Sequence, residues 1–474
     1  VAITARGVWE CVKHHFRNLG VDVQTQPFTM VGIGDMSGDV FGNGALQSRA
    51  MKLVAVFDHR HVFIDPDPDP DRSYRERERL FRLPRSSWRD YDISLISKGG
   101  GIYDRSAKAI PLSPEARRAL DIDAPAASGE EVIRRILCSR VDLLYNGGIG
   151  TYVKAVSEED ADVGDRANDR VRVNGSEVRT RVVAEGGNLG FTQRGRLEYW
   201  YRGGSINTDA VDNSGGVDMS DHEVNIKILL NHLVKKGVIA GREERNRILA
   251  EMTEEVADLV LADNANQSRA LTLDGLRSAA RYEDFVGVVE DMIAAGVVNR
   301  ADEAIPTKEE LLAKEQRQRG LPRPLLAVLL GHTKMWAYEM VMETDFPDGP
   351  EARPLLAAYF PRRLQDSFAQ HFEEHTLRRE IVATGAVNYV INNGGITFLP
   401  RMMTDTKAGI GEVLAAYLDA DRTAGAPARR ERVQGQGLPA AEEHRALLEI
   451  EESLESLSRE ALGAARAVDR SPAV

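Results

Sequence analysis

Two kinds of hydrophobic pattern divide the chain near residue 225. Before that point, short apolar and β-branched runs alternate with segments of helical spacing, which is the pattern expected of βαβ units and a parallel sheet. The runs expected to form strands are FTMVGIG (28–34), KLVAVFD (52–58), DISLIS (92–97), VDLLYN (141–146) and RVVAEG (181–186). Residues 1–225 therefore predict an α/β fold, an open doubly wound Rossmann-like domain with a parallel sheet.

An amphipathic helix is expected over Ile3–Leu19, ahead of the first strand. Its apolar face repeats at helical spacing through Val8, Val12 and Phe16, and Gly20 follows as a left-handed cap. This helix should pack beside the first strand.

After residue 225 the apolar positions follow helical spacing, in runs such as VNIKILLNHLVKKGVI and LRREIVATGAVNYVINN. This predicts a mostly α-helical domain over residues 226–421. Residues 422–438 are small and polar, which is typical of a linker, and a charged helix is expected over Ala440–Ala467. The last part, 422–474, is thus expected to be a polar linker with a terminal helix.

The first strand runs into a glycine-rich loop. Gly32, Gly34 and Gly38 would let the backbone turn sharply and approach a pyrophosphate, whose charge amide N–H groups at the next helix would bind. The second strand ends at Asp58, twenty residues after Gly38. An acid there would accept hydrogen bonds from the adenosine ribose and repel the 2′-phosphate of NADP. The alternative is a tight turn with no ligand.

Two features depart from the usual dinucleotide motif. Ser37 stands where a third glycine is usual, and Asp35 adds a negative charge where phosphate should lie, so Asp35 should point away or cap the helix. His59, Arg60 and His61 follow Asp58 closely and could accept a 2′-phosphate instead. NAD is therefore preferred over NADP without being required.

Four further segments place glycines with amides or hydroxyls at predicted strand ends: residues 98–101, 146–151, 185–190 and 213–217. In an open parallel sheet ligands bind at the carboxyl ends of the strands. These loops are therefore expected to converge on one crevice.

The composition narrows the possible partners. The net charge is −12, which disfavours a nucleic acid, and no apolar run approaches the ~18 residues that span a bilayer. Only Cys11 and Cys138 occur, which excludes a disulfide framework and suits a reducing cytoplasm. The chain starts at Val1 without a signal-like leader, so we expect a fragment of a larger cytoplasmic protein.

Three other clusters have simpler explanations than a functional site. His371 and His375 fit an HxxEH zinc spacing, but a solvated charged helix is favoured. The Asp-Pro run 65–71 is expected to be an extended exposed loop, and His222 a packed or capping residue. No metal is expected.

Several long segments resemble one family, the large NAD-specific glutamate dehydrogenases of bacteria. They are GIGDMSGDVFGNG, SKGGGIYDRSAKAIPLS, LLYNGGIGTYVKA, VRVNGSEVR, VVAEGGNLGFTQRGRLEY and INTDAVDNSGGVDMSDHEVNIKILL, with looser similarity to about residue 420. The resemblance implies oxidation of L-glutamate to 2-oxoglutarate and ammonium with NAD, by a homo-oligomer. Another amino-acid or 2-hydroxy-acid dehydrogenase, or an inactive nucleotide-binding scaffold, remains the alternative.

The resemblance also implies roles for residues of the glycine-rich segments. Thr4 would touch the nicotinamide amide, Asn146 and Gly147 would flank the nicotinamide ribose, and Asn188 would lie beside the same ring. The glycine loop and Asp58 would hold the pyrophosphate and the adenosine ribose.

For the substrate, the resemblance assigns the side-chain carboxylate to Ser220, with Asn213 fixing that turn. The catalytic lysines and aspartate belong to a substrate domain that precedes the nucleotide domain, so none is expected in this chain. Lys98, in KGGG, superficially resembles the catalytic lysine but follows the glycine loop, which favours a turn lysine.

Overall fold

The computed structural model describes residues 2–313 and 318–469, which form two compact units. The first unit comprises residues 1–216 with the short stretches 263–268 and 322–327, and the second comprises the remainder. The predicted domain boundaries at residues 225 and 421 stay predictions.

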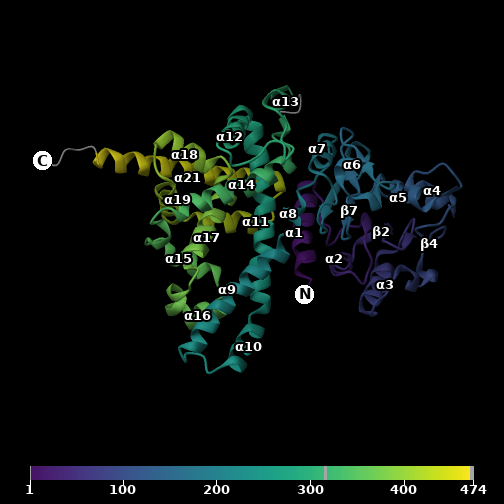
Figure 1. The fold of residues 1–474 in the computed structure, drawn as a ribbon, viewed down its shortest axis with the longest axis horizontal. Helices are drawn as coiled ribbons and strands as arrows, with labels where there is room; N and C mark the ends of the chain where they lie inside the picture. Colours follow the sequence, from purple (N-terminus) through teal and green to yellow (C-terminus); the bar gives the residue numbers. More distant parts are fainter. Residues whose placement is uncertain (1, 314–317, 470–474) are drawn as a thin grey trace. The chain divides into compact units, whose positions relative to one another are not determined.

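The first unit is built on a six-stranded sheet with the order β10-β7-β1-β2-β3-β4. Figure 1 labels β7, β2 and β4 of this sheet. Its strands are β1 (Phe28–Ile33), β2 (Met51–Phe57), β3 (His61–Ile64), β4 (Gly101–Asp104), β7 (Leu143–Asn146) and β10 (Val182–Glu185). Strands β10, β7, β1 and β2 are parallel, whereas β3 is antiparallel to both of its neighbours. The α/β fold class is confirmed, but the sheet is mixed at one edge and not parallel throughout. Two small ladders join β5 (Ile110–Pro111) to β6 (Ala126–Ala127) and β8 (Val153–Lys154) to β9 (Val173–Asn174).

Four of the five predicted strands are present, and the run DISLIS is the exception. It forms a 3₁₀ turn over Ile93–Leu95, because the carboxylate of Asp92 accepts hydrogen bonds from both the backbone N–H and the hydroxyl of Ser94. Such a local side-chain cap competes with strand pairing. Ile93 consequently stays 73% exposed.

Helices cover both faces of the sheet, as a doubly wound fold requires. Side chains alternate along each strand, so Phe28 and Met30 of β1 face one core while Val31 and Ile33 face the other. The first core is closed by α1 (Ile3–Asn18), α2 (Asp39–Gly44) and α3 (Pro70–Arg82), and the second by α4 (Pro114–Leu120), α5 (Gly129–Leu137) and α7 (Gln193–Tyr201). The short helices α6 (Asp160–Val163) and α8 (Asp209–Asp212) lie in the connecting loops.

The predicted first helix is confirmed as α1. Val8, Val12 and Phe16 are buried in the first core, and Gly20 follows the helix with a left-handed φ of 74°. The run of Asp-Pro pairs is more structured than expected: Asp65 is buried, and Asp69 caps α3 by accepting a hydrogen bond from the N–H of Arg72.

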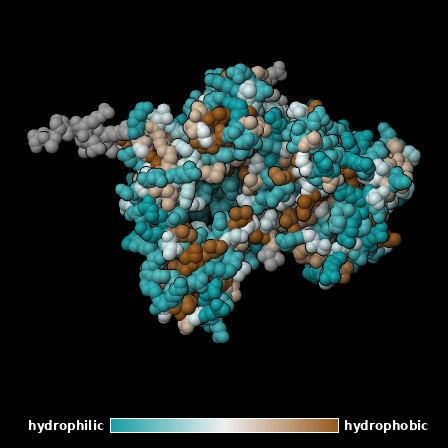
Figure 2. Space-filling model, viewed as in Figure 1, coloured by the Kyte–Doolittle hydropathy of each residue, from teal (hydrophilic) through white to brown (hydrophobic). Residues whose placement is uncertain are grey.

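Beyond residue 216 the described chain is helical. Its helices are α9 (Gly215–Lys235), α10 (Arg242–Glu251), α11 (Thr253–Ala280), α12 (Tyr282–Ala294), α13 (Lys308–Ala313), α14 (Arg323–Met342), α15 (Ala352–Tyr359), α16 (Arg362–Phe368), α17 (Arg378–Gly394), α18 (Phe398–Thr406), α19 (Ile410–Thr423), α20 (Ala426–Gly435) and α21 (Ala440–Asp469). Within the described residues, none of the helices combines the length and the apolar character needed to cross a bilayer. On the face shown in Figure 2, hydrophilic residues predominate and apolar ones form small groups.

The expected linker at 422–438 is helical over most of its length, and the reason is a buried arginine. Arg430 on α20 donates from Nε to Glu451 at 2.6 Å, from Nη1 to Asp421 at 2.6 Å and from Nη2 to the hydroxyl of Tyr417 at 2.9 Å. These bonds tie α20 to α19 and α21, so the polar composition here reflects an internal network and not an exposed spacer. The charged helix after it is confirmed as α21.

The second unit contains a packed histidine that makes its stability depend on pH. His222 is buried and its ring stacks on Tyr359 with 4.4 Å between centroids, and burial lowers its pKa to about 4. In the unfolded chain His222 has its ordinary pKa of 6.5 and takes up a proton more readily than in the folded chain. The free energy of unfolding therefore keeps its full value above pH 6.5 and decreases as the pH falls toward 4.

We therefore expect the variant His222→Phe, which keeps the stacked ring, to show a weaker pH dependence. Between pH 7.5 and pH 4.5 its unfolding free energy should fall by about 2.5 kcal/mol less than that of the unmodified chain. Urea unfolding followed by far-UV circular dichroism at the two pH values measures this difference. An identical pH dependence in both proteins would contradict it.

Candidate functional site

The order of the strands creates a crevice in the first unit. From β1 the chain continues to β2 on one side, whereas β7 and β10 lie on the other side of β1. The loops that leave β1 and β7 therefore diverge at neighbouring carboxyl ends, which is where open α/β sheets bind ligands. Three of the four predicted segments, 146–151, 185–190 and 213–217, meet near the glycine loop. The fourth, residues 98–101, precedes β4 and lies at the opposite end of the sheet, because Gly101 pairs with Ile64 at the end of the antiparallel strand β3, so that part of the prediction is wrong.

The loop after β1 is shaped by its glycines. Gly34 has φ of 138°, a conformation that L side chains rarely adopt, and its carbonyl accepts a hydrogen bond from the indole of Trp88 at 3.0 Å. A Cβ at Gly34 or Gly32 would lie within 2.6 Å of Phe41. The glycines thus let α2 pack directly over the end of β1.

Asp35 occupies part of the surface expected to bind a pyrophosphate. Its Oδ1 accepts hydrogen bonds from the backbone N–H groups of Ser37 and Gly38, both at 2.9 Å, and from the hydroxyl of Ser37 at 2.6 Å. The N–H of Gly38 is therefore already hydrogen-bonded to Asp35 in this conformation, and the pyrophosphate role of Gly38 stays a prediction. The N–H groups of Asp39 and Val40, at the start of α2, donate to no acceptor among the described residues.

Asp58 forms the turn between β2 and β3. Its backbone N–H donates to the carbonyl of His61, and its Oδ1 accepts hydrogen bonds from the backbone N–H groups of Arg60 and His61 at 2.7 and 2.6 Å. Its side chain is only 2% exposed, yet Oδ2 has no hydrogen-bond donor in the part of the chain that the structure describes. A carboxylate oxygen of Asp35 and a nitrogen of His59 lie within 4.8 Å of the Asp58 carboxylate. Its unsatisfied oxygen is thus close to the glycine loop.

The loop after β7 contacts both neighbouring loops. The N–H of Gly147 donates to the carbonyl of Ile33 at 2.9 Å, and the carbonyl of Asn146 accepts from Gly186 and Gly187 at 2.7 and 3.0 Å. Asn146 is fully buried, and its side-chain Nδ2 has no acceptor among the described residues. A Cβ at Gly147 would lie 2.7 Å from Cα of Phe41, so this loop sits against the backbone of α2.

The loop after β10 is fixed by a buried ion pair. Glu185 accepts two hydrogen bonds from Arg196, at 2.7 and 3.1 Å, and both side chains are at most 5% exposed. Farther along the loop, Asn188 is exposed and its Oδ1 accepts a hydrogen bond from Nδ2 of Asn213 at 2.5 Å. The structure therefore brings Asn188 and Asn213 together at the crevice.

Sequence reasoning missed the buried acid beneath this loop. Asp212 accepts hydrogen bonds from the N–H of Glu185 at 2.8 Å and from the side chain of Asn207 at 2.7 Å. Its complete burial raises its pKa to about 7. The string DAVDN offers only a turn-like signal, and the role of Asp212 depends on partners that are distant in sequence.

Thr4 and Ser220 lie on different units. Thr4 is in the first turn of α1, where a Cβ at Gly216 would lie 2.6 Å from its hydroxyl, so Thr4 is close to the turn that follows Asn213. Ser220 lies on α9 in the second unit and its side chain is exposed. The cofactor and substrate roles of both residues stay predictions.

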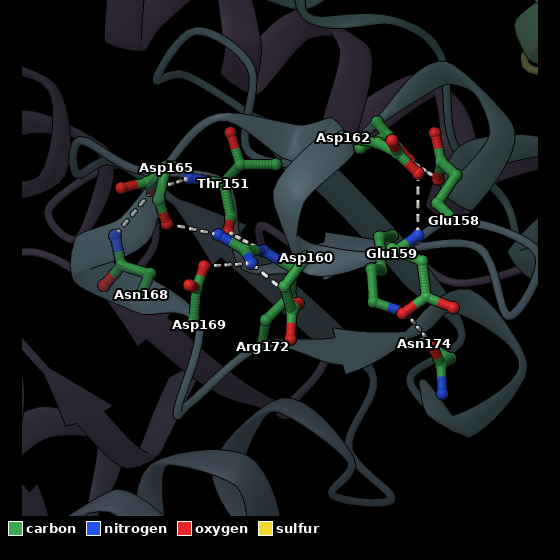
Figure 3. A network of polar contacts seen from close by, with 12 residues as sticks. Thr151, Glu158, Glu159, Asp160, Asp162, Asp165, Asn168, Asp169, Arg172 and Asn174 are labelled. Carbon is green, nitrogen blue, oxygen red and sulfur yellow. Dashed lines mark hydrogen bonds and ion pairs between the residues drawn. The ribbon is translucent and has the colours of Figure 1, made fainter.

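A buried arginine, Arg172, holds the loop that follows β7 in place. Arg172 is 0% exposed and donates from Nε to the carbonyl of Thr151 at 2.9 Å, and from Nη1 to Asp160 and Asp169 at 2.8 and 2.7 Å (Figure 3). Thr151 in turn donates its N–H to Asp165 at 2.8 Å. Figure 3 shows these acidic side chains arranged around the guanidinium, which explains a charge run that the sequence leaves without a role.

We expect Arg172→Met to destabilise the first unit by about 3 kcal/mol, because it leaves a cluster of carboxylates without their buried cation. The matched control is Arg170→Met, since Arg170 is 83% exposed and its pair with Glu130 spans 3.4 Å, and a cost of about 0–1 kcal/mol is expected there. Urea unfolding monitored by tryptophan fluorescence measures both. Equal losses in the two variants would show that the network does not support this unit.

The histidines and the lysine that the sequence singled out make contacts with other residues of the protein. His371 contacts Glu374 at 3.0 Å and His375 contacts the carbonyl of Asn225 at 2.9 Å, so the two imidazoles face separate groups. Lys98 is 89% exposed and pairs with Glu115 at 3.0 Å. Cys11 and Cys138 are both free thiols.

Comparison with known proteins agrees with this geometry. Residues 1–274 match the family described as bacterial NAD-glutamate dehydrogenase, catalytic domain, and residues 318–467 match glutamate dehydrogenase, C-terminal. Proteins called NAD-specific glutamate dehydrogenase are 47% identical in Mycobacterium tuberculosis over 97% of this chain, 46% in Halomonas elongata over 88% and 47% in Pseudomonas aeruginosa over 88%. The chain spans 26–29% of the length of these relatives. The matched domain covers more than half of the chain, which therefore belongs to the bacterial NAD-glutamate dehydrogenase family.

Proposed function

We propose that the crevice at the ends of β1, β2 and β7 binds NAD, in an enzyme that oxidises L-glutamate to 2-oxoglutarate and ammonium. The relatives reported above carry the name NAD-specific glutamate dehydrogenase. The observation that carries the proposal is the buried Oδ2 of Asp58, which lacks a donor within the described residues. Nδ1 of His61 lies 3.7 Å from this oxygen, beyond hydrogen-bonding distance. A buried polar atom without a hydrogen bond is costly, so a hydroxyl supplied by a ligand would stabilise it.

The residues present fit a dinucleotide. Asp58 offers an acceptor at the end of β2, and Asn146 offers the Nδ2 donor at the end of β7, with β1 between them. Two strand spacings separate these positions by about 10 Å, so an extended ligand is needed to reach both. We assign the adenosine ribose to Asp58 and the nicotinamide ribose to Asn146 and Gly147, with Thr4 and Asn188 close to the nicotinamide.

The pyrophosphate would lie over the loop after β1. Because Asp35 already holds the amides of Ser37 and Gly38, we assign the phosphate oxygens to the N–H groups of Asp39 and Val40. Gly32 and Gly34 let Phe41 of α2 pack against this loop, and we assign their backbone to the approach to the pyrophosphate. The carboxylate of Asp58 would repel a 2′-phosphate and so favours NAD over NADP.

Held by these residues, NAD would supply the acceptor for the Cα hydride of glutamate, and hydrolysis of the oxidised substrate would release ammonium. The part played by this chain is to hold the cofactor and to bind the side-chain carboxylate through Ser220, with Asn213 fixing the neighbouring turn. We propose that the catalytic lysines and aspartate lie in the additional length of the relatives, and that the whole protein is a homo-oligomer.

Hydrogen exchange in the presence of NADH tests the assignment of the crevice. NADH should slow exchange at the amides of residues 39–40, 146–148 and 186–188, and leave the β5–β6 ladder unchanged. The β5–β6 ladder is the internal control because it is not part of the crevice. Protection confined to other segments, or none at saturating NADH, would contradict the assignment.

A further inference from the structure

The buried acid Asp212 lies where two segments of the crevice meet. Its Oδ2 accepts a hydrogen bond at 2.8 Å from the N–H of Glu185, the last residue of β10. The next residue in the chain, Asn213, donates from Nδ2 to Oδ1 of Asn188 at 2.5 Å. Asp212 thus joins the start of the loop after β10 to the turn that contacts Asn188 in the same loop. The proposed function assigns Asn188 to the nicotinamide but gives no role to Asp212.

Both oxygens of the Asp212 carboxyl face donors that cannot reverse. Oδ2 faces the backbone N–H of Glu185, which can only donate. Oδ1 accepts from Nδ2 of Asn207 at 2.7 Å, and Oδ1 of Asn207 accepts from Nε of Arg323 at 2.6 Å. Because a guanidinium group has no acceptor, the amide of Asn207 must keep its oxygen toward Arg323 and its NH₂ group toward Asp212. This arrangement suits a carboxylate at residue 212 and not a carboxylic acid.

The other ionisable groups around Asp212 come from five elements of the first unit. They are Cys11 of α1, Tyr145 of β7, Glu185 of β10, Arg196 of α7 and Arg323 of α14. Burial raises the pKa of the Cys11 thiol and of the Tyr145 hydroxyl, so both stay neutral near pH 7. Burial also raises the pKa of Glu185, but two hydrogen bonds from Arg196 hold it as a carboxylate. Asp212, whose pKa burial raises to about 7, is thus the group of this cluster that changes its charge near neutral pH.

Protonation of Asp212 would place an O–H against one of these fixed donors. The N–H of Glu185 or the NH₂ group of Asn207 would then lose its acceptor, which is costly for a buried donor. We propose that Asp212 is a positioning residue for the nicotinamide end of the NAD site, and that it holds the loop after β10 in place only as the carboxylate. The inference rests on the proposed function, because it concerns the same crevice.

Titrations of the 474-residue chain with NADH at pH 6 and pH 8 test the proposal. With a pKa of about 7, Asp212 is ionised in about a tenth of the molecules at pH 6 and in about nine tenths at pH 8, so the affinity should rise about tenfold. Asp212→Asn should bind NADH at both pH values about as weakly as the unmodified chain does at pH 6, since an amide offers one acceptor to two donors. A purely structural role would weaken binding in this variant but keep its pH dependence.

The matched control is Asp142→Asn. Asp142 also accepts a hydrogen bond from a backbone N–H, that of Thr29 at 2.9 Å, but at the ends of β1 and β7 opposite to the crevice. This variant should retain the tenfold rise. Cys11→Ala tests the proposal without changing Asp212: it removes the thiol that donates to Asp212, so the midpoint of the pH dependence should move to higher pH. Cys138→Ala, at the other free thiol, should leave the midpoint unchanged.

Hydrogen exchange without NADH separates failure of this proposal from failure of the proposed function. After correction for the intrinsic effect of pH, protection of the N–H groups of residues 185–187 should decrease from pH 8 to pH 6 in the unmodified chain and stay constant in Asp212→Asn. NADH affinity that does not change with pH, or that rises equally in Asp212→Asn, would overturn the role of Asp212 and leave the NAD site in place. Absence of NADH binding at both pH values, with the change in protection present, would contradict the proposed function itself and with it the role of Asp212 toward the cofactor.

Discussion

Replacing Gly147 by alanine is expected to weaken NADH binding about 100-fold. The added Cβ would lie 2.7 Å from Cα and 2.8 Å from N of Phe41, well inside the 3.4 Å at which ordinary contact begins. Both atoms belong to the backbone, so α2 or the β7 loop must move. Moving either element misplaces the polar groups that we assign to the nicotinamide ribose, and losing two or three hydrogen bonds at about 1 kcal/mol each gives about that factor. The overpacking should also reduce the free energy of unfolding by about 1–3 kcal/mol.

NADH fluorescence titration, together with thermal unfolding, measures the two effects of Gly147→Ala. The control is Gly287→Ala on α12, where an added Cβ meets nothing within 4 Å and the backbone is ordinary helix. There we expect unchanged NADH affinity and a small gain in stability. If the Gly147 variant bound NADH as tightly as the control, the close packing of the loop after β7 against α2 would have no effect on cofactor binding.

The second large effect is expected for Asp58→Asn. This change keeps an oxygen for the backbone N–H groups of Arg60 and His61 but removes the charged acceptor that we assign to the ribose. Hydrogen bonds to charged groups contribute about 1.5–3 kcal/mol, so NADH affinity should fall about 10- to 100-fold. The affinity for NADPH should fall much less, since the repulsion of the 2′-phosphate is removed as well.

Parallel titrations of the Asp58→Asn chain with NADH and NADPH measure this change in preference. A melting temperature close to that of the unmodified chain would show that the β2–β3 turn is retained. An unaltered ratio of the two affinities would remove Asp58 from the cofactor site.

The parts of the fold that follow local rules could be predicted from the sequence. Apolar alternation gives β1, β2, β7 and β10, and helical spacing followed by glycine gives α1 and its cap. The position of the crevice also follows, because three glycine-rich strings come directly after β1, β7 and β10. These signals depend on residues that are neighbours in the chain.

The parts that depend on distant partners could not be predicted. The antiparallel strand β3, between β2 and β4, follows a turn that Asp58 closes with its own carboxylate, in a string that also fits the dinucleotide motif. Arg172 and Arg430 belong to charged, polar strings that predict exposure, and only the folded chain shows that both are buried. The N–H of Gly38 could donate to a ligand or to the nearby carboxylate of Asp35, and the spacing of residues alone does not decide between them. In the structure it donates to Asp35.

A calorimetric titration of the 474-residue chain with NADH measures directly whether this chain holds the cofactor. If the first unit holds the cofactor in the crevice between β1 and β7, the chain should show one saturable site of micromolar affinity and bind NADPH more weakly. Heats that do not saturate, or equal affinity for NADH and NADPH, would show that the crevice is not an NAD site of the kind proposed.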